Sequence, residues 1–190
     1  MSLAPIKEKY AELVLFFQTW IPLYLPEANL YLVGQNAPRP ENPYIAFEPI
    51  VDITYMGNDE TRIDDEGNET LRGQRYLTCN LYGFSEANTR FDGEDNAWEM
   101  LQELRFSLRY PDVVLLLNAI NCRVVEEGIV ENNSETLNTT NEPRAVLQIV
   151  FSTVIVQDID SGEIDTVNAE GTMETPAGNE IISDISVTKP

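Results

Sequence analysis

The beginning of the chain carries apolar residues at helical spacing. Pro5 suits the first turn of a helix, whereas Pro22 and Pro26 are expected to end it, because each removes a backbone donor and clashes with the preceding turn. Apolar side chains that recur at intervals of three and four residues lie on one stripe of a helix. That stripe consists of Ile6, Tyr10, Leu13, Val14 and Phe17.

Strand patterns follow this predicted helix. The apolar run from Leu30 to Val33 predicts a first strand, and the proline-rich stretch 37–43 keeps the next part extended. Strict alternation then predicts a longer strand. Its same-face residues are Ile45, Phe47, Val51, Ile53 and Tyr55. Pro49 shares their parity, which predicts an edge position or a β-bulge.

A polar and acidic segment, Gly57–Thr70, separates this strand from a second one over residues 71–84. In the second strand Leu77, Cys79 and Leu81 share one face, and mainly polar residues share the other. The two strands predict a long β-hairpin with a large acidic loop. Because long ordered loops often carry function, the acids of this segment are candidate interface residues. They are Asp59, Glu60, Asp64, Asp65, Glu66 and Glu69.

Helical spacing returns in the middle of the chain. Its apolar positions are Ala97, Trp98, Met100, Leu101, Leu104 and Leu108. Ser85 is suited to cap this helix, and Pro111 is expected to end it. Residues 113–120 fit either a short second helix or a turn, and Cys122 and Val124 then indicate a strand.

The last part of the chain alternates between polar and apolar stretches. Residues 131–143 are interpreted as a second polar loop. Arg144–Gln157 carries the strongest strand pattern, and its apolar residues on both faces predict a central strand or a second buried contact. A final strand is predicted at 164–169. The tail Gly171–Pro190 has weak periodicity, so we expect an arm that orders only against a partner.

These elements predict an α+β fold. We expect a mixed, mainly antiparallel sheet of about four to six strands, with an N-terminal helix and a central helix packed on one face. The long acidic hairpin loop would project from this sheet. Residues 1–172 are expected to form a single domain, and residues 173–190 a C-terminal extension.

Charge narrows the class of partner. The 190 residues contain 32 acids and 12 bases, for a formal net charge of −20. Gripping duplex DNA requires clustered lysine and arginine, which this sequence lacks, and the same argument disfavours an anionic membrane surface. Acidity favours solubility, or a surface that must not stick to nucleic acid.

Catalytic equipment is scarce in this sequence. It contains no histidine, which excludes a Ser-His-Asp triad, a Cys-His pair and an imidazole metal ligand. It shows no phosphate-binding loop and no dinucleotide fingerprint. A carboxylate pair of the glycosidase type stays open as an alternative. We expect no enzyme, no catalytic residue, no cofactor and no metal site.

The two cysteines, Cys79 and Cys122, lie in apolar strand patterns. We expect both to be buried free thiols, as in a reducing compartment. No apolar run is long enough to span a bilayer, and no signal-peptide pattern is present, so a soluble protein made inside the cell is expected.

Three short phrases carry a resemblance to the phage neck and tail-terminator family. They are Asn42-Pro43-Tyr44-Ile45 before a long strand, Leu81-Tyr82-Gly83-Phe84 before a helix, and Glu142-Pro143-Arg144-Ala145 before an alternating strand. The order of elements over residues 3–172 also resembles this family.

The resemblance implies an α+β subunit of the virion, assembled in the host cytoplasm. Such subunits form a ring, usually a hexamer, on the head-proximal end of a phage tail tube. The ring stops polymerisation of the tube protein, provides the docking surface for neck, head-completion or connector proteins, and lets DNA pass without binding it specifically. The family offers no catalytic residues to carry over.

Within this interpretation, part of the Asp59–Glu69 segment is expected to face the DNA channel or the tube. Arg144, beside Glu142, is a candidate for an ion pair between subunits. Two other classes remain open: another connector, adaptor or tail-tube protein, and an acidic module that mimics nucleic acid and binds a basic partner.

Overall fold

The structure is a computed structural model that describes residues 4–63, 69–85 and 96–133. It also describes the strands in 135–137, 140–142, 144–159, 166–175 and 178–188. The chain divides into two compact units, Met1–Asp158 and Ile159–Pro190. Each unit is treated by itself below.

The first unit contains three helices and a six-stranded sheet among its described residues. Its helices are α1 (Ala4–Tyr24), α2 (Ala97–Ser107) and α3 (Pro111–Ala119). Its strands are β1 (Asn29–Leu32), β2 (Tyr44–Ile63), β3 (Glu69–Phe84), β4 (Cys122–Glu127), β5 (Glu131–Asn132), β6 (Glu135–Leu137), β7 (Thr140–Glu142) and β8 (Arg144–Ile159).

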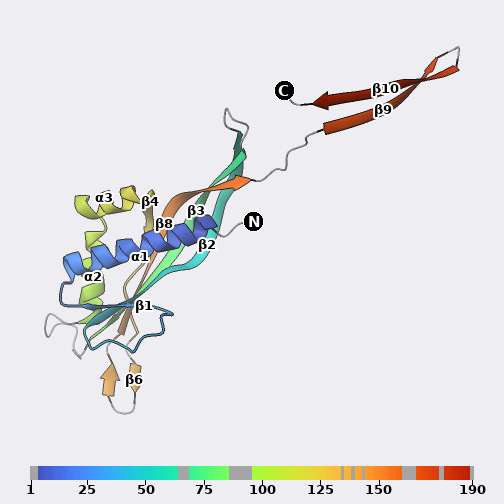
Figure 1. Cartoon of the computed structure of the whole chain (residues 1–190). Coiled ribbons are helices and arrows are strands. Elements are labelled where there is room, and N and C mark those ends of the chain that lie inside the picture. The colour runs from blue at the N-terminus through green and yellow to red at the C-terminus, as the bar shows by residue number, and fades with distance from the viewer. Residues whose placement is uncertain are drawn as a thin grey trace. The chain divides into compact units, whose positions relative to one another are not determined.

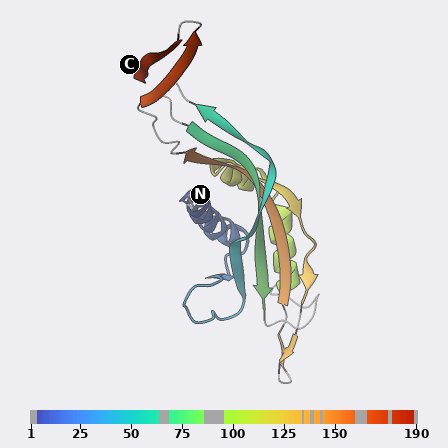
Figure 2. The same ribbon diagram turned by 90° about the vertical axis from the view of Figure 1, so that its right-hand side faces the viewer.

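The sheet has the order β1-β2-β3-β8-β4, and β5 pairs with β8 beyond the end of β4 (Figures 1 and 2). β1 is parallel to β2, with Leu30 opposite Ile45, whereas β2 is antiparallel to β3 and β4 is antiparallel to β8. The predicted α+β class with a mixed, mainly antiparallel sheet is therefore confirmed.

The core lies between the sheet and the helices. Phe17 and Trp20 of α1 are fully buried, and the ring of Phe17 lies 5.4 Å from Phe47 of β2 and 6.3 Å from Phe151 of β8. The indole Nε1 of Trp20 donates a hydrogen bond to the Ser107 hydroxyl of α2 at 2.8 Å. Aromatic rings of one helix thus hold two strands and a second helix together.

One helix boundary differs from its prediction. Pro22 lies inside α1, which ends at Tyr24, so the expectation that Pro22 ends the helix was wrong. A proline in the last turn removes only one helical hydrogen bond, and its would-be acceptor residue, Gln18, is exposed to water. Trp20 and Ile21, which precede Pro22, are buried and pack this turn against the core.

The second long helix region agrees with its prediction. α2 covers the predicted helical positions up to Leu104, and Leu108 is its C-cap. α3 begins at Pro111, which decides for a helix rather than a turn there. Asn96 is the N-cap of α2, and the Ser85 hydroxyl also accepts a hydrogen bond, from the Ala97 amide, at 3.0 Å. Ser85, although distant in sequence, therefore also caps the N-terminus of α2, as expected.

The acidic segment is mostly strand, not loop. β2 continues to Ile63 and β3 begins at Glu69, with Ile63 opposite Glu69, so residues 57–63 and 69–70 of the expected large loop belong to strands. Residues 64–68 lie outside the described residues. In this part of β2 both faces of the strand are largely exposed, so apolar alternation is not required there. Gly57, at φ +70°, lies where the pairing register shifts, between Met56 and Glu60.

The bulge predicted at Pro49 is confirmed. The pairing of β2 with β3 shifts register between Glu48 and Asp52, on either side of this proline. The buried thiol of Cys79 donates to the Pro49 carbonyl at 2.6 Å. Cys79 and Cys122 are both free and buried, as expected, and burial raises the pKa of each thiol.

The predicted loop over 131–143 contains three short strands, so that interpretation was wrong in part. β5 pairs with β8, and β6 and β7 form a small hairpin with Leu137 opposite Thr140. β8 is central, between β3 and β4, as predicted.

The second unit contains an antiparallel ribbon. β9 (Thr166–Thr175) pairs with β10 (Gly178–Thr188), from Thr175 opposite Gly178 to Thr166 opposite Thr188. The tail beyond Gly171 contains most of this ribbon, and its expected ordering against a partner stays a prediction. β9 runs across residues 172 and 173, between which we expected the domain to end.

Candidate assembly interfaces

Asp59, the first candidate of the acidic segment, is held in an ion pair within β2 and β3. Its two carboxylate oxygens each accept a hydrogen bond from Arg75 at 2.6 Å, and the two side chains are 19% and 6% exposed. The Arg75 guanidinium also lies over the ring of Tyr55, 4.1 Å from its centre. This bidentate contact lowers the pKa of Asp59 and raises that of Arg75.

A pH-dependent contribution to stability follows from this ion pair. Because the pKa of Asp59 is lowered in the folded state, its contribution is present above the ordinary carboxyl pKa of about 3.9 and is lost as the pH falls through the lowered value. We expect Asp59→Asn to be less stable than wild type in urea unfolding at about pH 7, and the difference to vanish in strong acid. Equal stability at neutral pH would contradict a role for this pair.

The other candidates of the acidic segment are distributed differently. Glu60 is exposed on β2 and forms an ion pair with Arg62 at 3.2 Å, and Glu69 is half-buried at the start of β3. Asp64, Asp65 and Glu66 lie outside the described residues. The structure thus gives Asp59 an internal partner and leaves Glu60 at the surface.

Arg144 lies at the other end of the sheet, against aromatic rings. The rings of Tyr44 and Phe84 stack with their centres 4.4 Å apart, and the Arg144 guanidinium lies 5.5 Å from the centre of Phe84. Arg39 lies over both rings, at 5.3 and 5.2 Å. Glu142 belongs to β7, and its side chain lies outside the described residues.

The three phrases that carry the family resemblance meet at this cluster. Tyr44 comes from the first phrase, Phe84 from the second and Arg144 from the third, and the first two are opposite each other in β2 and β3. The cation–π contacts and the stacked rings fasten the ends of three strands. The sequence alone offered no reason to include Arg39, because it lies in the connection between β1 and β2.

Exposed apolar side chains gather on the part of the sheet that the helices leave uncovered. We call residues 51–63 of β2, 69–76 of β3 and 154–157 of β8 the sheet arm; these strands extend past the helices in Figures 1 and 2. Its exposed apolar side chains are Val51, Tyr55, Met56, Ile63, Val154 and Val156, which are between 36% and 65% exposed. Such a collection is typical of a protein–protein contact.

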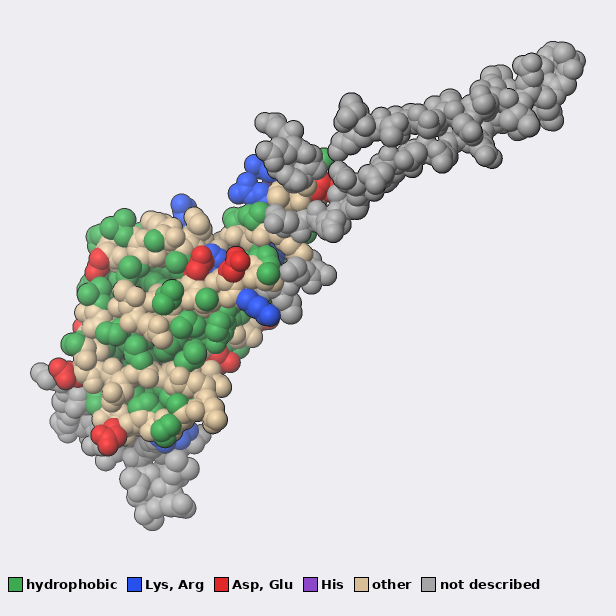
Figure 3. Space-filling model, in the orientation of Figure 1, with side chains coloured by type: hydrophobic (Ala, Val, Ile, Leu, Met, Phe, Trp, Pro, Cys, Tyr) green, Lys and Arg blue, Asp and Glu red, His purple; other side chains and the backbone are tan. Residues whose placement is uncertain are grey.

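A second set of exposed apolar side chains lies on the helix layer. Figure 3 shows hydrophobic side chains spread across the helix-bearing face, with charged ones scattered between them. The largest exposures are Leu15 and Leu23 of α1 at 64% and 55%, Phe106 of α2 at 63%, and Leu115 of α3 at 69%. The unit therefore carries two different apolar surfaces.

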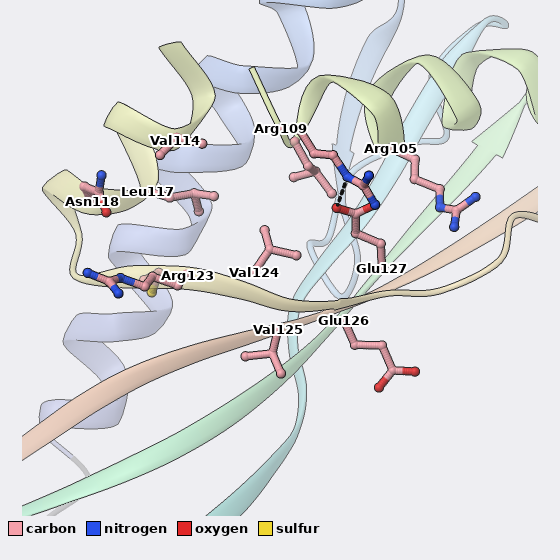
Figure 4. A pocket seen from close by; sticks show the side chains of 12 residues that line it. Arg105, Arg109, Val114, Leu117, Asn118, Arg123, Val124, Val125, Glu126 and Glu127 are labelled. Carbon is pink, nitrogen blue, oxygen red and sulfur yellow. Dashed lines mark hydrogen bonds and ion pairs between the residues drawn. The ribbon is translucent and has the colours of Figure 1, made fainter. Parts of the chain in front are cut away.

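A pocket of about 720 Å³ opens between α2, α3 and β4. Figure 4 shows Arg109 and Glu127 side by side in its lining, while Val125 and Glu126 point to the other side of β4. The Arg109 guanidinium donates two hydrogen bonds to the Glu127 carboxylate, at 3.1 and 3.0 Å. Arg105 also lines the pocket. Within the described part of the chain no group of three or more metal-ligating side chains comes together, and no helix is long and apolar enough to cross a membrane.

Comparison with known proteins agrees with the resemblance seen in the sequence. The phage neck terminator protein family matches residues 11–177, which include most of α1, the whole of α2 and α3, and the whole six-stranded sheet. No curated protein matches the chain. Because the match covers most of the sequence, the chain belongs to the phage neck terminator family, a family of structural proteins of the bacteriophage neck.

Proposed function

We propose that this chain forms a ring at the head-proximal end of a phage tail tube. There it stops polymerisation of the tube protein and forms the neck interface through which DNA passes. The observation that carries this proposal is the presence of two different exposed apolar surfaces, the sheet arm and the helix layer, on one subunit. Two different surfaces allow each subunit to bind the next head to tail. Such an association gives a closed ring when the rotation from one subunit to the next adds up to a full turn.

Charge supports the same function. A formal net charge of −20 repels DNA phosphates, so a channel lined by such subunits would not trap the passing duplex. We assign the exposed carboxylates of the β2–β3 hairpin, such as Glu60, to the wall of the DNA channel or to the contact with the tube. A structure of the assembled ring with this hairpin on its outer rim, touching nothing, would exclude that assignment.

Electron microscopy of the purified chain, alone and mixed with its tube protein, tests the ring. We expect single rings, and tubes that carry one ring at one end and stop growing there. Long tubes made by this chain alone would favour a tail-tube protein. A mass below a tetramer, together with unchanged tube growth, would favour the acidic binding module.

A further inference from the structure

The central strand β8 has an open edge inside the first unit. β4 pairs with β8 only from Cys122, opposite Thr153, to Glu127, opposite Ile149, while β8 itself continues to Ile159. Beyond Thr153 no described strand lies on that side of β8. Unpaired backbone amides and carbonyls at a sheet edge are a template for a further strand.

The side chains around this edge select the kind of strand that fits. A cleft of about 430 Å³ lies here, next to the pocket of Figure 4, and Val154 and Val156 line it with 46% and 44% of their surfaces exposed. Its charged lining residues are Arg72 and Arg123, and neither forms an ion pair with any described residue. In a chain with 32 acids, the described lining of this cleft contains none.

The β9–β10 ribbon has the complementary chemistry. Its two strands contain four acids and no lysine or arginine: Glu170, Glu174, Glu180 and Asp184. They also contain isoleucines and valines that suit an apolar contact. A two-stranded ribbon is marginally stable by itself in water, so it needs a further strand or surface.

We propose that the acidic β9–β10 ribbon of one subunit adds to the open edge of β8 in a second copy, beside the cleft that Arg72 and Arg123 line. Backbone hydrogen bonds to residues 154–157 supply the affinity, and the two guanidiniums select an acidic strand. This inference rests on the proposed ring and names the contact that links its subunits. Each subunit places its own ribbon on one neighbour and binds the ribbon of another neighbour at its β8 edge.

Charge exchange in the full-length chain tests this contact. The cleft variant carries Arg72→Glu and Arg123→Glu, and the ribbon variant carries lysine at the four acidic positions of β9 and β10. We expect each variant alone to self-associate at least about tenfold more weakly than wild type, measured by light scattering and sedimentation with and without tube protein. Lys7→Glu, exposed near the start of α1 and outside the cleft, the ribbon and the sheet arm, is the control for the change of charge and should associate as wild type does.

Mixing the two variants separates exchange between subunits from folding defects. In the mixture, each ribbon meets a cleft of opposite charge only on the other variant, so association should return. If association stays lost in the mixture, the proposal is overturned. That result is expected if each ribbon binds the cleft of its own chain, because mixing cannot then restore the contact. Undiminished association of either variant alone would overturn it as well.

The same measurements distinguish this inference from the proposed function. If both variants form the same rings as wild type, the proposed function stands and the ribbon contact is excluded. Open oligomers that respond to the charge exchange, with no ring on the tube, support the contact and contradict the proposed function.

Discussion

Replacing Trp20 with alanine is expected to lower the free energy of unfolding by about 3–5 kcal/mol. The side chain is fully buried, and its ring lies 5.3 Å from Phe16 and 5.9 Å from Phe17. The substitution leaves a cavity between α1 and α2 and removes the 2.8 Å hydrogen bond to Ser107. Both losses act on the contact that joins α1 to α2.

Urea unfolding followed by circular dichroism measures this effect. Leu15→Ala is the matched control, because Leu15 lies on the same helix with 64% of its surface exposed, and its change should stay within about 0.5 kcal/mol. Trp20→Phe should fall between the two, since it keeps a ring but leaves the Ser107 hydroxyl without its indole donor. Equal stability of Trp20→Ala and Leu15→Ala would show that α1 is not anchored by this residue.

Gly83→Ala is expected to destabilise the fold by about 1–3 kcal/mol, although it adds only one methyl group. A Cβ at this position would lie 2.9 Å from the Ala97 carbonyl oxygen and 3.2 Å from the Leu101 side chain. The nearer atom is backbone, so α2 must move away from β3 to make room. That movement opens the core where the helix begins.

Thr78→Ala is the control for Gly83→Ala. Thr78 lies on the same strand, on the face that does not meet the core cluster, so its effect should be smaller and reflect strand propensity alone. Free energies of unfolding from urea titration compare the two variants. A Gly83→Ala protein as stable as wild type would mean that α2 and β3 are not in close contact there.

Apolar periodicity was sufficient where one face of an element meets the core. The buried Leu13 and Phe17 of α1 and the alternation of Leu77, Cys79 and Leu81 in β3 followed from it. Tyr10, expected on the same stripe of α1, is 38% exposed, and the buried face of that helix also includes Phe16, Trp20 and Ile21. These elements were predictable because burial forces a period of two or of three to four on the residues that face inward. Family membership also followed from the order of these elements and three short phrases.

Periodicity failed where a strand is exposed on both faces. The residues from Gly57 to Ile63 look like loop because no face of that ribbon must be apolar, and their strand is maintained by cross-strand pairing with β3. The strands β6 and β7 were missed because they are short and mostly polar, so their sequence shows no apolar alternation. Sequence reasoning offered Asp59 as a candidate interface residue and did not foresee its ion pair, because Arg75 is brought beside it only by the hairpin register.

The sequence by itself determined the fold class, the main core elements, the absence of histidine chemistry and the family, since these depend on local pattern and composition. Only the tertiary structure decided which charges are paired, which apolar side chains stay exposed on the sheet arm, and where β8 has an open edge. Those properties depend on which strands lie side by side. Pairing between distant segments is set by the whole core, and no single segment carries that information.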